Sequence, residues 1–233
     1  MLRLEEYRKE RIGEDDMISR GVNFGDIHSF NDLNLILSPF VPTPATPKTS
    51  YIDVPGGDGS LDLTEALGEV KFNDRGFTFT FSVNPADKMT FDDKVSQVSN
   101  ALNGKCCKIT IDRDPEYYWD GRLSVDQYMQ DRNLKKIVVK AIVKPYKFRQ
   151  DVTVSTVALT SSEKSVVLTN GRKSVVPEIT CTNDNTVVKL GNVSKSLSKG
   201  THKVLDFQLV EGDNTFRVSG SGTISFKYQE GAL

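Results

Sequence analysis

The feature that most restricts the fold is a change in residue pattern near position 148. Beyond it, helical spacing of apolar residues disappears, and valine, threonine and serine dominate. Short alternating runs there are separated by turn sequences such as Asn-Gly, Gly-Asn and Gly-Asp-Asn. The runs cover 165–168, 186–190, 204–209, 215–218 and 223–228. This spacing is typical of an antiparallel sandwich, so we predict an all-β domain over 149–233.

The residues before this boundary show both the two-residue alternation of strands and the spacing of apolar residues that is typical of helices. Phenylalanine and valine alternate with threonine and serine over 77–83, which predicts a strand with one apolar face. Thr90 followed by Asp93 is typical of a helix N-cap, and Gly104 can end a helix. Apolar residues recur at helical spacing between them, so we predict one amphipathic helix over about 91–103.

A long β-hairpin is predicted over 119–131 and 134–146, with its turn at 131–133. Leu123, Val125 and Met129 share one parity in its first strand and should face the same side. The predicted fold is therefore mixed and mainly β. An α+β domain over 17–148, with one helix and a long hairpin, precedes the sandwich.

Two further segments before the first strand are rich in turn-forming residues. Residues 38–50 contain four prolines, which predicts an extended arm because proline cannot donate to a strand ladder. The following turn-rich loop consists of Pro55, Gly56, Gly57, Asp58 and Gly59. It lacks the Gly-Lys-Ser/Thr ending of a phosphate-binding loop, so we interpret it as a turn or a contact loop.

Charge and hydropathy exclude several classes of protein. The chain of 233 residues has 30 basic and 31 acidic side chains, which argues against a generally basic nucleic-acid binder. No apolar run approaches the ~20 residues of a membrane span. The first ten residues are charged where a signal peptide needs an apolar core. Residues 1–16 are interpreted either as an N-terminal extension or as a segment before a native start at Met17.

The three cysteines indicate a reducing compartment. Cys106 and Cys107 are adjacent, a separation at which a disulfide is strained, and Cys181 stands alone. We therefore expect three free thiols, as in a protein made in the cytoplasm. The alternative is one bridge from Cys106 or Cys107 to Cys181, with a spare thiol.

Candidates for catalysis and metal binding are weak. Residues 112–116 contain three carboxylates, but a calcium loop starting at Asp112 would need Gly and Glu where Tyr117 and Leu123 stand. A turn between strands is the better interpretation. His28 and His202 accompany no nucleophile-elbow pattern and no metal-ligand spacing. We therefore predict no catalytic, metal or cofactor-binding residues and no enzyme activity.

An aromatic segment is the remaining candidate site. Tyr117, Tyr118 and Trp119 lie close to Arg122, a combination enriched at protein interfaces. The alternative is an ordinary strand edge whose rings alternate between the two faces. A protein contact is favoured over a sugar-binding site. Together with the loop over 55–59, these residues form the predicted interface.

The ordered set of motifs resembles the distal tail protein family of long-tailed, non-contractile bacteriophages and prophages. The matching pieces are His28-Ser29 and the runs 55–64, 77–81, 100–105, 117–123, 144–147 and 212–216. The resemblance rests on the order of these pieces along the chain. The resemblance runs from about residue 17 to the C-terminus, and residues 1–16 match nothing in it.

The resemblance implies a homohexameric ring at the tail tip, with galectin-like C-terminal sandwiches pointing outward. Such a ring joins the tail tube protein to the tail-associated hub or lysin and to receptor-binding parts. Its channel passes the tape measure protein and then DNA. The implied location is the virion tail tip, after assembly in the host cytoplasm. The alternative function is that of a binding protein, namely a carbohydrate-binding sandwich module with an accessory domain.

Overall fold

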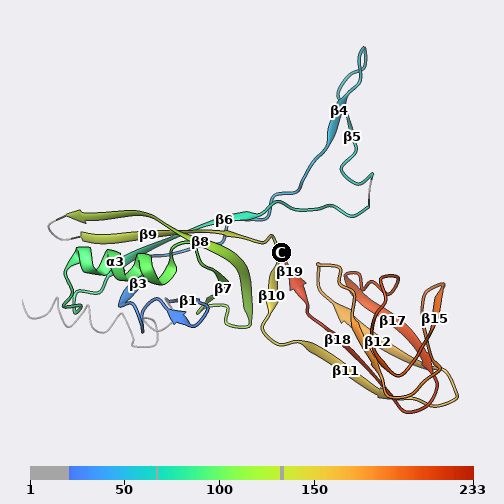
Figure 1. The fold of residues 1–233 in the computed structure, drawn as a ribbon. Helices are drawn as coiled ribbons and strands as arrows, with labels where there is room; N and C mark the ends of the chain where they lie inside the picture. The colour runs from blue at the N-terminus through green and yellow to red at the C-terminus, as the bar shows by residue number, and fades with distance from the viewer. Residues whose placement is uncertain (1–20, 67, 132–133) are drawn as a thin grey trace, which may run out of the picture. The chain divides into compact units, whose positions relative to one another are not determined.

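The structure is a computed structural model that describes residues 21–66, 68–131 and 134–233 (Figure 1). Residues 1–16 and Met17 lie outside the described residues, so the two interpretations of the N-terminus stay predictions. The chain forms two compact units, one ending at Pro145 and the other spanning Tyr146–Leu233. The described residues are mainly β, as the sequence predicts.

The first unit is built on a curved antiparallel sheet with the strand order β2-β1-β7-β8-β9-β6-β3. These strands are β1 Val22–Phe24, β2 Ile27–His28, β3 Leu35–Leu37, β6 Arg75–Val83, β7 Cys106–Ile111, β8 Tyr117–Asp131 and β9 Leu134–Val143. A second, two-stranded ribbon is formed by β4 Tyr51–Asp53 and β5 Ser60–Asp62.

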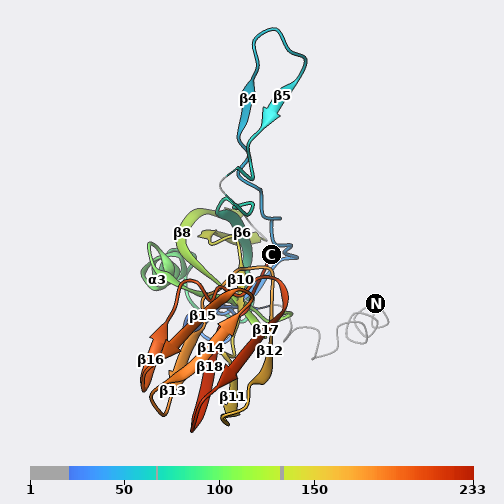
Figure 2. The same ribbon diagram turned by 90° about the vertical axis from the view of Figure 1, so that its right-hand side faces the viewer.

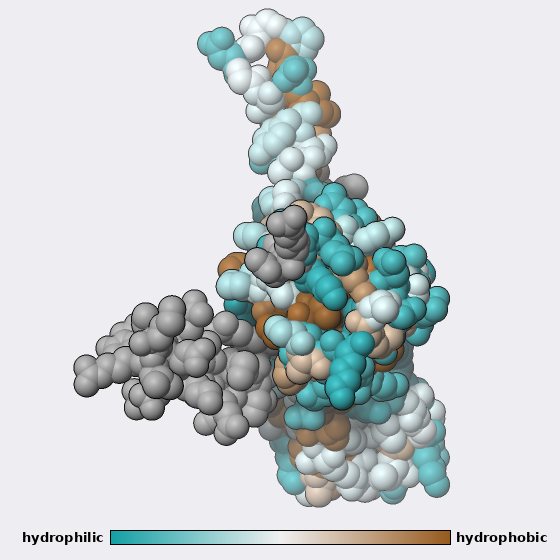
Figure 3. All heavy atoms as spheres, turned by 90° about the vertical axis from the view of Figure 1, so that its left-hand side faces the viewer, coloured by the Kyte–Doolittle hydropathy of each residue, from teal (hydrophilic) through white to brown (hydrophobic). Residues whose placement is uncertain are grey.

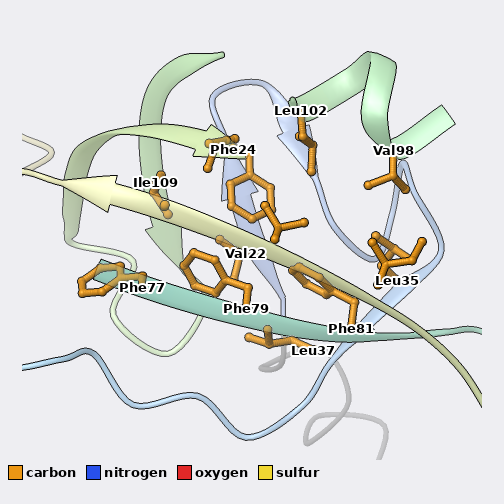
Figure 4. Packing of buried hydrophobic residues seen from close by; sticks show 14 of the residues in the cluster. Val22, Phe24, Leu35, Leu37, Phe77, Phe79, Phe81, Val98, Leu102 and Ile109 are labelled. Carbon is orange, nitrogen blue, oxygen red and sulfur yellow. The ribbon is translucent and has the colours of Figure 1, made fainter. Parts of the chain in front are cut away.

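The core of the first unit is organised around β6. Phe77, Phe79 and Phe81 are fully buried, while Thr78 between them is exposed, which confirms the predicted alternation. Phe24 of β1 meets Phe79 edge to face, with 5.5 Å between the ring centroids. Figure 4 shows these rings pointing into the space between β1 and β6, beside aliphatic side chains from β3, β7 and the helix.

The helix α3 spans Phe91–Leu102, one residue shorter than predicted. The Thr90 hydroxyl accepts a hydrogen bond from the Asp93 N–H at 3.2 Å, so Thr90 is the N-cap. Gly104 has a φ of +77°, a backbone conformation that favours glycine and ends the helical path. Val98 and Leu102 are buried and pack onto the core of the sheet.

Replacing Thr90 with alanine should destabilise the first unit by about 1 kcal/mol, because the Asp93 N–H loses its capping partner. Urea unfolding followed by tryptophan fluorescence measures this, since the single tryptophan of the chain, Trp119, lies in this unit. Thr90→Ser keeps the hydroxyl and should stay close to the unsubstituted protein. An equal loss in both variants would contradict the capping role.

The predicted β8–β9 hairpin is present, although β8 begins two residues earlier and β9 ends three residues earlier than predicted. The side chains in its distal half face the opposite way from the prediction. A bulge between Val125 and Gln127 inserts one extra residue into β8. Leu123 is buried as expected, whereas Met129 is 56% exposed, so its predicted facing is wrong. The bulge shifts the parity of every residue beyond it. The predicted turn at 131–133 lies largely outside the described residues.

The second unit, described in full, is an antiparallel sandwich of two four-stranded sheets (Figure 2). One sheet has the order β11-β18-β13-β16, formed by Thr153–Ala158, Thr223–Tyr228, Glu178–Cys181 and Gly200–Lys203. The other has the order β12-β17-β14-β15, formed by Lys164–Asn170, Gly212–Ser219, Thr186–Leu190 and Val193–Leu197. A short ribbon pairs β10, Lys147–Arg149, with β19, Gly231–Ala232.

Four of the five predicted strands of this unit are present, and the fifth is wrong. Residues 204–209 form a turn and a connecting segment instead of a strand. Phe207 and Leu209 are fully buried in the sandwich core, but Leu205 is 80% exposed. The alternating pattern therefore arises from a loop that inserts two apolar side chains between the sheets.

Two further properties follow from the described residues. Cys106, Cys107 and Cys181 are free thiols, and Cys181 is buried in the second unit. None of the helices described is long and apolar enough to cross a membrane.

Candidate protein interface

The structure brings together two residues considered for chemistry, His28 and Asp112. The His28 Nε2 lies 3.1 Å from Asp112 Oδ2, which also accepts the Gly21 N–H at 2.8 Å. The His28 Nδ1 accepts the N–H groups of Phe30 and Asn31, at 3.2 and 3.0 Å. This arrangement requires the Nε2-protonated tautomer. Both ring nitrogens of His28 therefore take part in hydrogen bonds that fasten the turn after β2.

The other candidates for chemistry also have structural roles. Residues 112–116 form the turn between β7 and β8, as predicted. His202, in the second unit, has its Nε2 2.8 Å from the carbonyl oxygen of Ser198. Among the residues described, no three His, Cys, Asp or Glu side chains are placed to hold a metal ion.

A shallow pocket of about 530 Å³ lies on the first unit. Its lining combines three cations and two carboxylates with two thiols, namely Asp74, Cys106, Cys107, Lys108, Asp120, Gly121, Arg122, Ile142, Val143 and Lys144. Burial is the main reason why the pKa of the Cys107 thiol is raised. A raised pKa keeps that thiol protonated and therefore a poor nucleophile.

The proline-rich segment 38–50 leaves the sheet after β3 and lacks a strand ladder of its own, as predicted for an arm. We call residues 38–74 the arm, and the β4–β5 ribbon forms its outer part. At the root, the Lys48 N–H donates to the Lys71 carbonyl at 2.7 Å, and Pro47 bridges to Phe72. The first and last parts of the arm are therefore held side by side near the sheet.

Arg75, the first residue of β6, fastens the root of the arm to the core. Its Nε donates to the Thr43 carbonyl, and its Nη1 donates to the Pro145 carbonyl at 3.2 Å. The guanidinium lies 5.3 Å from the Phe77 ring and 5.9 Å from the Trp119 ring, both measured to the centroid. Burial lowers the pKa of Arg75, but an arginine stays charged at neutral pH.

The predicted loop of Pro55, Gly56, Gly57, Asp58 and Gly59 forms the exposed tip of the arm. Gly56 and Gly59 have φ values of +80° and +75°, and open space surrounds both, so the turn needs glycine for its backbone conformation alone. Figures 1 and 2 both show the β4–β5 ribbon standing clear of the sheet. The tip is therefore available to a partner.

The aromatic segment divides between the interior and the surface. Trp119 is buried in the core, 5.4 Å from Phe77 between ring centroids. Tyr118 is buried too, and the Lys108 Nζ lies 4.3 Å from its ring centroid. Tyr117 is half-buried, and Arg122 is exposed with its Nη1 donating to the Gly104 carbonyl at 2.7 Å.

The predicted interface residues are thus not one cluster. The loop over 55–59 lies at the end of the arm, and Tyr117–Arg122 lies in the sheet. Only Tyr117 and Arg122 of the aromatic segment offer accessible side-chain surface. The burial of Trp119 removes the flat exposed ring that a sugar site over this segment would use.

Sequence reasoning missed two features of the arm. Ile52 and Leu61 form a directly opposed pair in the β4–β5 ribbon, and each is more than half exposed. The alternation of apolar and acidic residues over 51–54 and 61–63 is a sequence signal for such a two-faced ribbon. Arg75 has no comparable signal, because its role depends on contacts with Thr43 and Pro145, far away in sequence.

The carboxylate of Asp62 is fixed on the ribbon. It accepts hydrogen bonds from the side chain and the N–H of Thr64, which hold the pKa of Asp62 below its usual range. Lowering the pKa keeps this carboxylate charged to more acidic pH. Asp62 pairs with Tyr51, so its carboxylate lies on the face of the ribbon opposite Ile52 and Leu61.

No protein-family model matches the chain, and no curated protein matches it. Among solved structures, it is similar to the crystal structure of SPP1 Dit (gp 19.1), a protein described as a paradigm of the hub adsorption apparatus in phages that infect Gram-positive bacteria. The match covers 90% of this chain and 98% of that one, with a TM-score of 0.67 and 12% sequence identity. The chain therefore has the fold of a phage Dit protein, in agreement with the resemblance found in its sequence.

Proposed function

We propose that the chain is a structural hub protein of a phage or prophage-derived tail tip. The observation that carries this proposal is the extent of the fold match, 90% of this chain and 98% of SPP1 Dit. A match of that extent includes both units and not merely one widespread module.

In the proposed assembly, six copies close a ring that joins the tail tube protein to the tail-associated hub or lysin. Receptor-binding parts attach to the same tip, and the channel passes the tape measure protein and DNA. A ring requires a heterologous contact whose rotation closes. The arm and the β8–β9 hairpin are proposed to provide most of this contact, together with Tyr117 and Arg122. The role is passive and needs neither catalysis nor a cofactor.

The distribution of charged side chains is compatible with a channel through which DNA passes. Six copies together carry about −6, which is small for an assembly of this size. On the hairpin and the strand end beside it, the Lys140 Nζ lies 3.0 Å from Asp126, and the Lys144 Nζ lies 3.6 Å from Asp120. Unpaired cations would bind phosphates and slow the transit of DNA. We therefore predict a channel lining without a continuous Lys/Arg stripe, and a cryo-EM map of the ring measures this. A strongly basic lumen would contradict it.

Electron microscopy of the purified full chain tests the ring itself. Six-fold rings are expected, either from the protein alone or from the protein co-expressed with the other tail components, which can act as templates. Deleting residues 40–50 should convert rings to monomers, as measured by light scattering. Oligomers that survive this deletion would contradict the role of the arm. A protein that stays monomeric alone and beside its tail partners would contradict the proposed function.

A further inference from the structure

The sandwich of the second unit has one edge strand that is left open. In the first unit, exposed apolar side chains gather on one side of the β4–β5 ribbon, which belongs to the proposed ring contact (Figure 3). In the second unit, Val152 and Val154, just before and within β11, are 40% and 58% exposed. Strand β11 pairs with β18 alone, and Figure 2 shows β11 and β16 on opposite sides of their sheet. The side of β11 that faces away from β18 is therefore a free sheet edge.

The other three edge strands of the sandwich each contain a lysine. Strands β12, β15 and β16 contain Lys164, Lys195 and Lys203, in that order. Lysine on an edge strand discourages pairing with another chain, and so does a short strand such as β16. Between Asp151 and Glu163, in contrast, the chain has no charged residue, no proline and no glycine. Strand β11 therefore lacks the protection that the other edges have.

The backbone of β11 has hydrogen-bonding groups that point away from the sheet. The Leu159 N–H donates to the Gly222 carbonyl at 2.8 Å, which continues the register of β11 with β18. In an antiparallel ladder, hydrogen-bonded pairs alternate with pairs that are not hydrogen-bonded. Counting back from Leu159, the N–H and C=O groups of Val154 and Thr156 therefore face the free edge.

Only one end of this edge is satisfied within the chain. The Ala158 carbonyl has the same parity and accepts a hydrogen bond from the Lys164 Nζ at 2.8 Å. In this unit, which the structure describes in full, no hydrogen bond reaches the edge-facing groups of Val154 and Thr156. Two donors and two acceptors are therefore available to an added strand, which is the arrangement that β-augmentation uses.

We propose that the free edge of β11 binds an extended, uncharged strand of another tail protein. This inference rests on the proposed function and adds to it the place and the mode of attachment of one partner. An uncharged strand is favoured, because a charge beside β11 would find no counter-charge there. A second copy is disfavoured. Two identical antiparallel strands pair about a twofold axis, whereas neighbouring copies in a closed ring are related head to tail.

A synthetic strand tests the mode of binding. The probe is the hexapeptide Thr-Val-Thr-Val-Thr-Val on a polyethylene glycol tail, added to the full chain. With a dissociation constant of about 1 mM, about 5 mM peptide should slow hydrogen exchange of the Val154 and Thr156 amides about sixfold. The same peptide with N-methyl groups on alternate amides cannot form the ladder and should leave exchange unchanged. No slowing by either peptide, or equal slowing by both, would overturn the inference.

A matched pair of variants tests the site. Thr156→Pro removes an edge-facing donor and is tolerated on an edge strand, whereas Thr156→Ala keeps that donor. Thr156→Pro should weaken peptide binding at least about tenfold, and Thr156→Ala less than about twofold. Exchange of the Val154 amide measures both. Equal effects of the two substitutions would place the peptide elsewhere and contradict the role of β11.

Photo-crosslinking identifies the occupant. A photo-reactive phenylalanine analogue replaces Val154 of β11 or Thr201 of β16, which is also exposed, and the chain is co-expressed with the other tail components. Crosslinks to a different polypeptide are expected from position 154 and should be at least about tenfold fewer from position 201, on a protected edge. Crosslinks from position 154 to a second copy, or none to another polypeptide, would overturn the docking.

Electron microscopy of the same samples separates this inference from the proposed function. Rings whose β11 edge is bare beside their tail partners would overturn the docking and leave the hub in place. Peptide binding that Thr156→Pro weakens, in a chain that forms no ring with or without partners, would support β11 as a strand-binding edge and contradict the hub. Neither rings nor peptide binding would contradict both.

Discussion

Replacing Asp87 with alanine should destabilise the first unit by about 3–5 kcal/mol, because it leaves a buried ammonium without its counter-ion. Lys94 of α3 is 1% exposed, and its Nζ contacts the Asp87 carboxylate, whose side chain is 4% exposed. The same Nζ donates to the Leu33 carbonyl at 3.1 Å and to Gln97 Oε1 at 2.8 Å. The pair therefore ties the helix, the segment before it and the loop before β3 together.

Urea unfolding followed by Trp119 fluorescence measures this loss. The matched control is Lys140→Ala, which breaks an exposed ion pair with Asp126 in the same unit and should cost at most about 1 kcal/mol. A double variant, Lys94→Met with Asp87→Leu, removes both charges and should recover most of the stability lost in Asp87→Ala. A cost below about 1 kcal/mol for Asp87→Ala would contradict the importance of this pair.

The same pair predicts how stability depends on pH. A hydrogen bond from Lys94 is the main cause that lowers the pKa of Asp87, aided by the Met89 N–H at 2.9 Å. In the unfolded chain this carboxyl titrates near its ordinary value of about 3.9. Its contribution is therefore complete above that value and is lost as the pH falls through the lower pKa of the folded protein. The stability gap between the unsubstituted protein and Asp87→Asn should narrow as the pH is lowered from about 6 to about 3. A difference in the free energy of unfolding that stays constant over this pH range would contradict the lowered pKa of Asp87.

The elements that the sequence predicted correctly are those whose pattern is local. The alternation in β6 is continuous over Arg75–Val83, and its faces follow directly from a period of two. The helix α3 has a cap, a periodic apolar face and a glycine after its end, so three independent signals agree within fifteen residues. Their agreement explains why the helix was predicted within one residue.

The errors arise where one extra residue or a long-range contact changes the outcome. The bulge beyond Val125 has no marker in the sequence, yet it reverses the faces of every later residue in β8. In 204–209, Phe207 and Leu209 alternate as strand residues do, although they insert into the core from a loop. Periodicity reports which side chains are apolar, not whether the backbone between them forms a ladder.

The sequence predicts only part of the candidate interface, because some of its features depend on local residues and others on long-range contacts. The glycines at 56 and 59 identify a turn from composition alone, and the turn is exposed as a contact loop requires. Trp119 could not be assigned to the core or to the surface from its neighbours, because its burial depends on Phe77 in a distant strand. The alternation over 51–54 and 61–63 signals a two-faced ribbon, but only the strand register shows that Ile52 is directly opposite Leu61.

We propose that the two units are independently folding domains. Phe216 and Phe226 are fully buried in the second unit, with ring centroids 4.9 Å apart, and Phe79 is fully buried in the first. Phe216→Ala and Phe79→Ala should each cost about 3–5 kcal/mol, through lost burial and the cavity left behind. A loss of this size shifts a urea midpoint by roughly 2 M, or unfolds the affected unit in the absence of urea.

Each substitution should act on its own unit alone. Trp119 fluorescence follows the first unit, and hydrogen exchange of peptides from β12 and β17 follows the second. Phe216→Ala should lower protection of those peptides and leave the fluorescence midpoint within about 0.3 M, whereas Phe79→Ala should do the reverse. If either substitution moves both readouts together, the chain unfolds as a single cooperative structure. Independent behaviour suits the proposed hub, because strain applied to one unit would then not loosen the other.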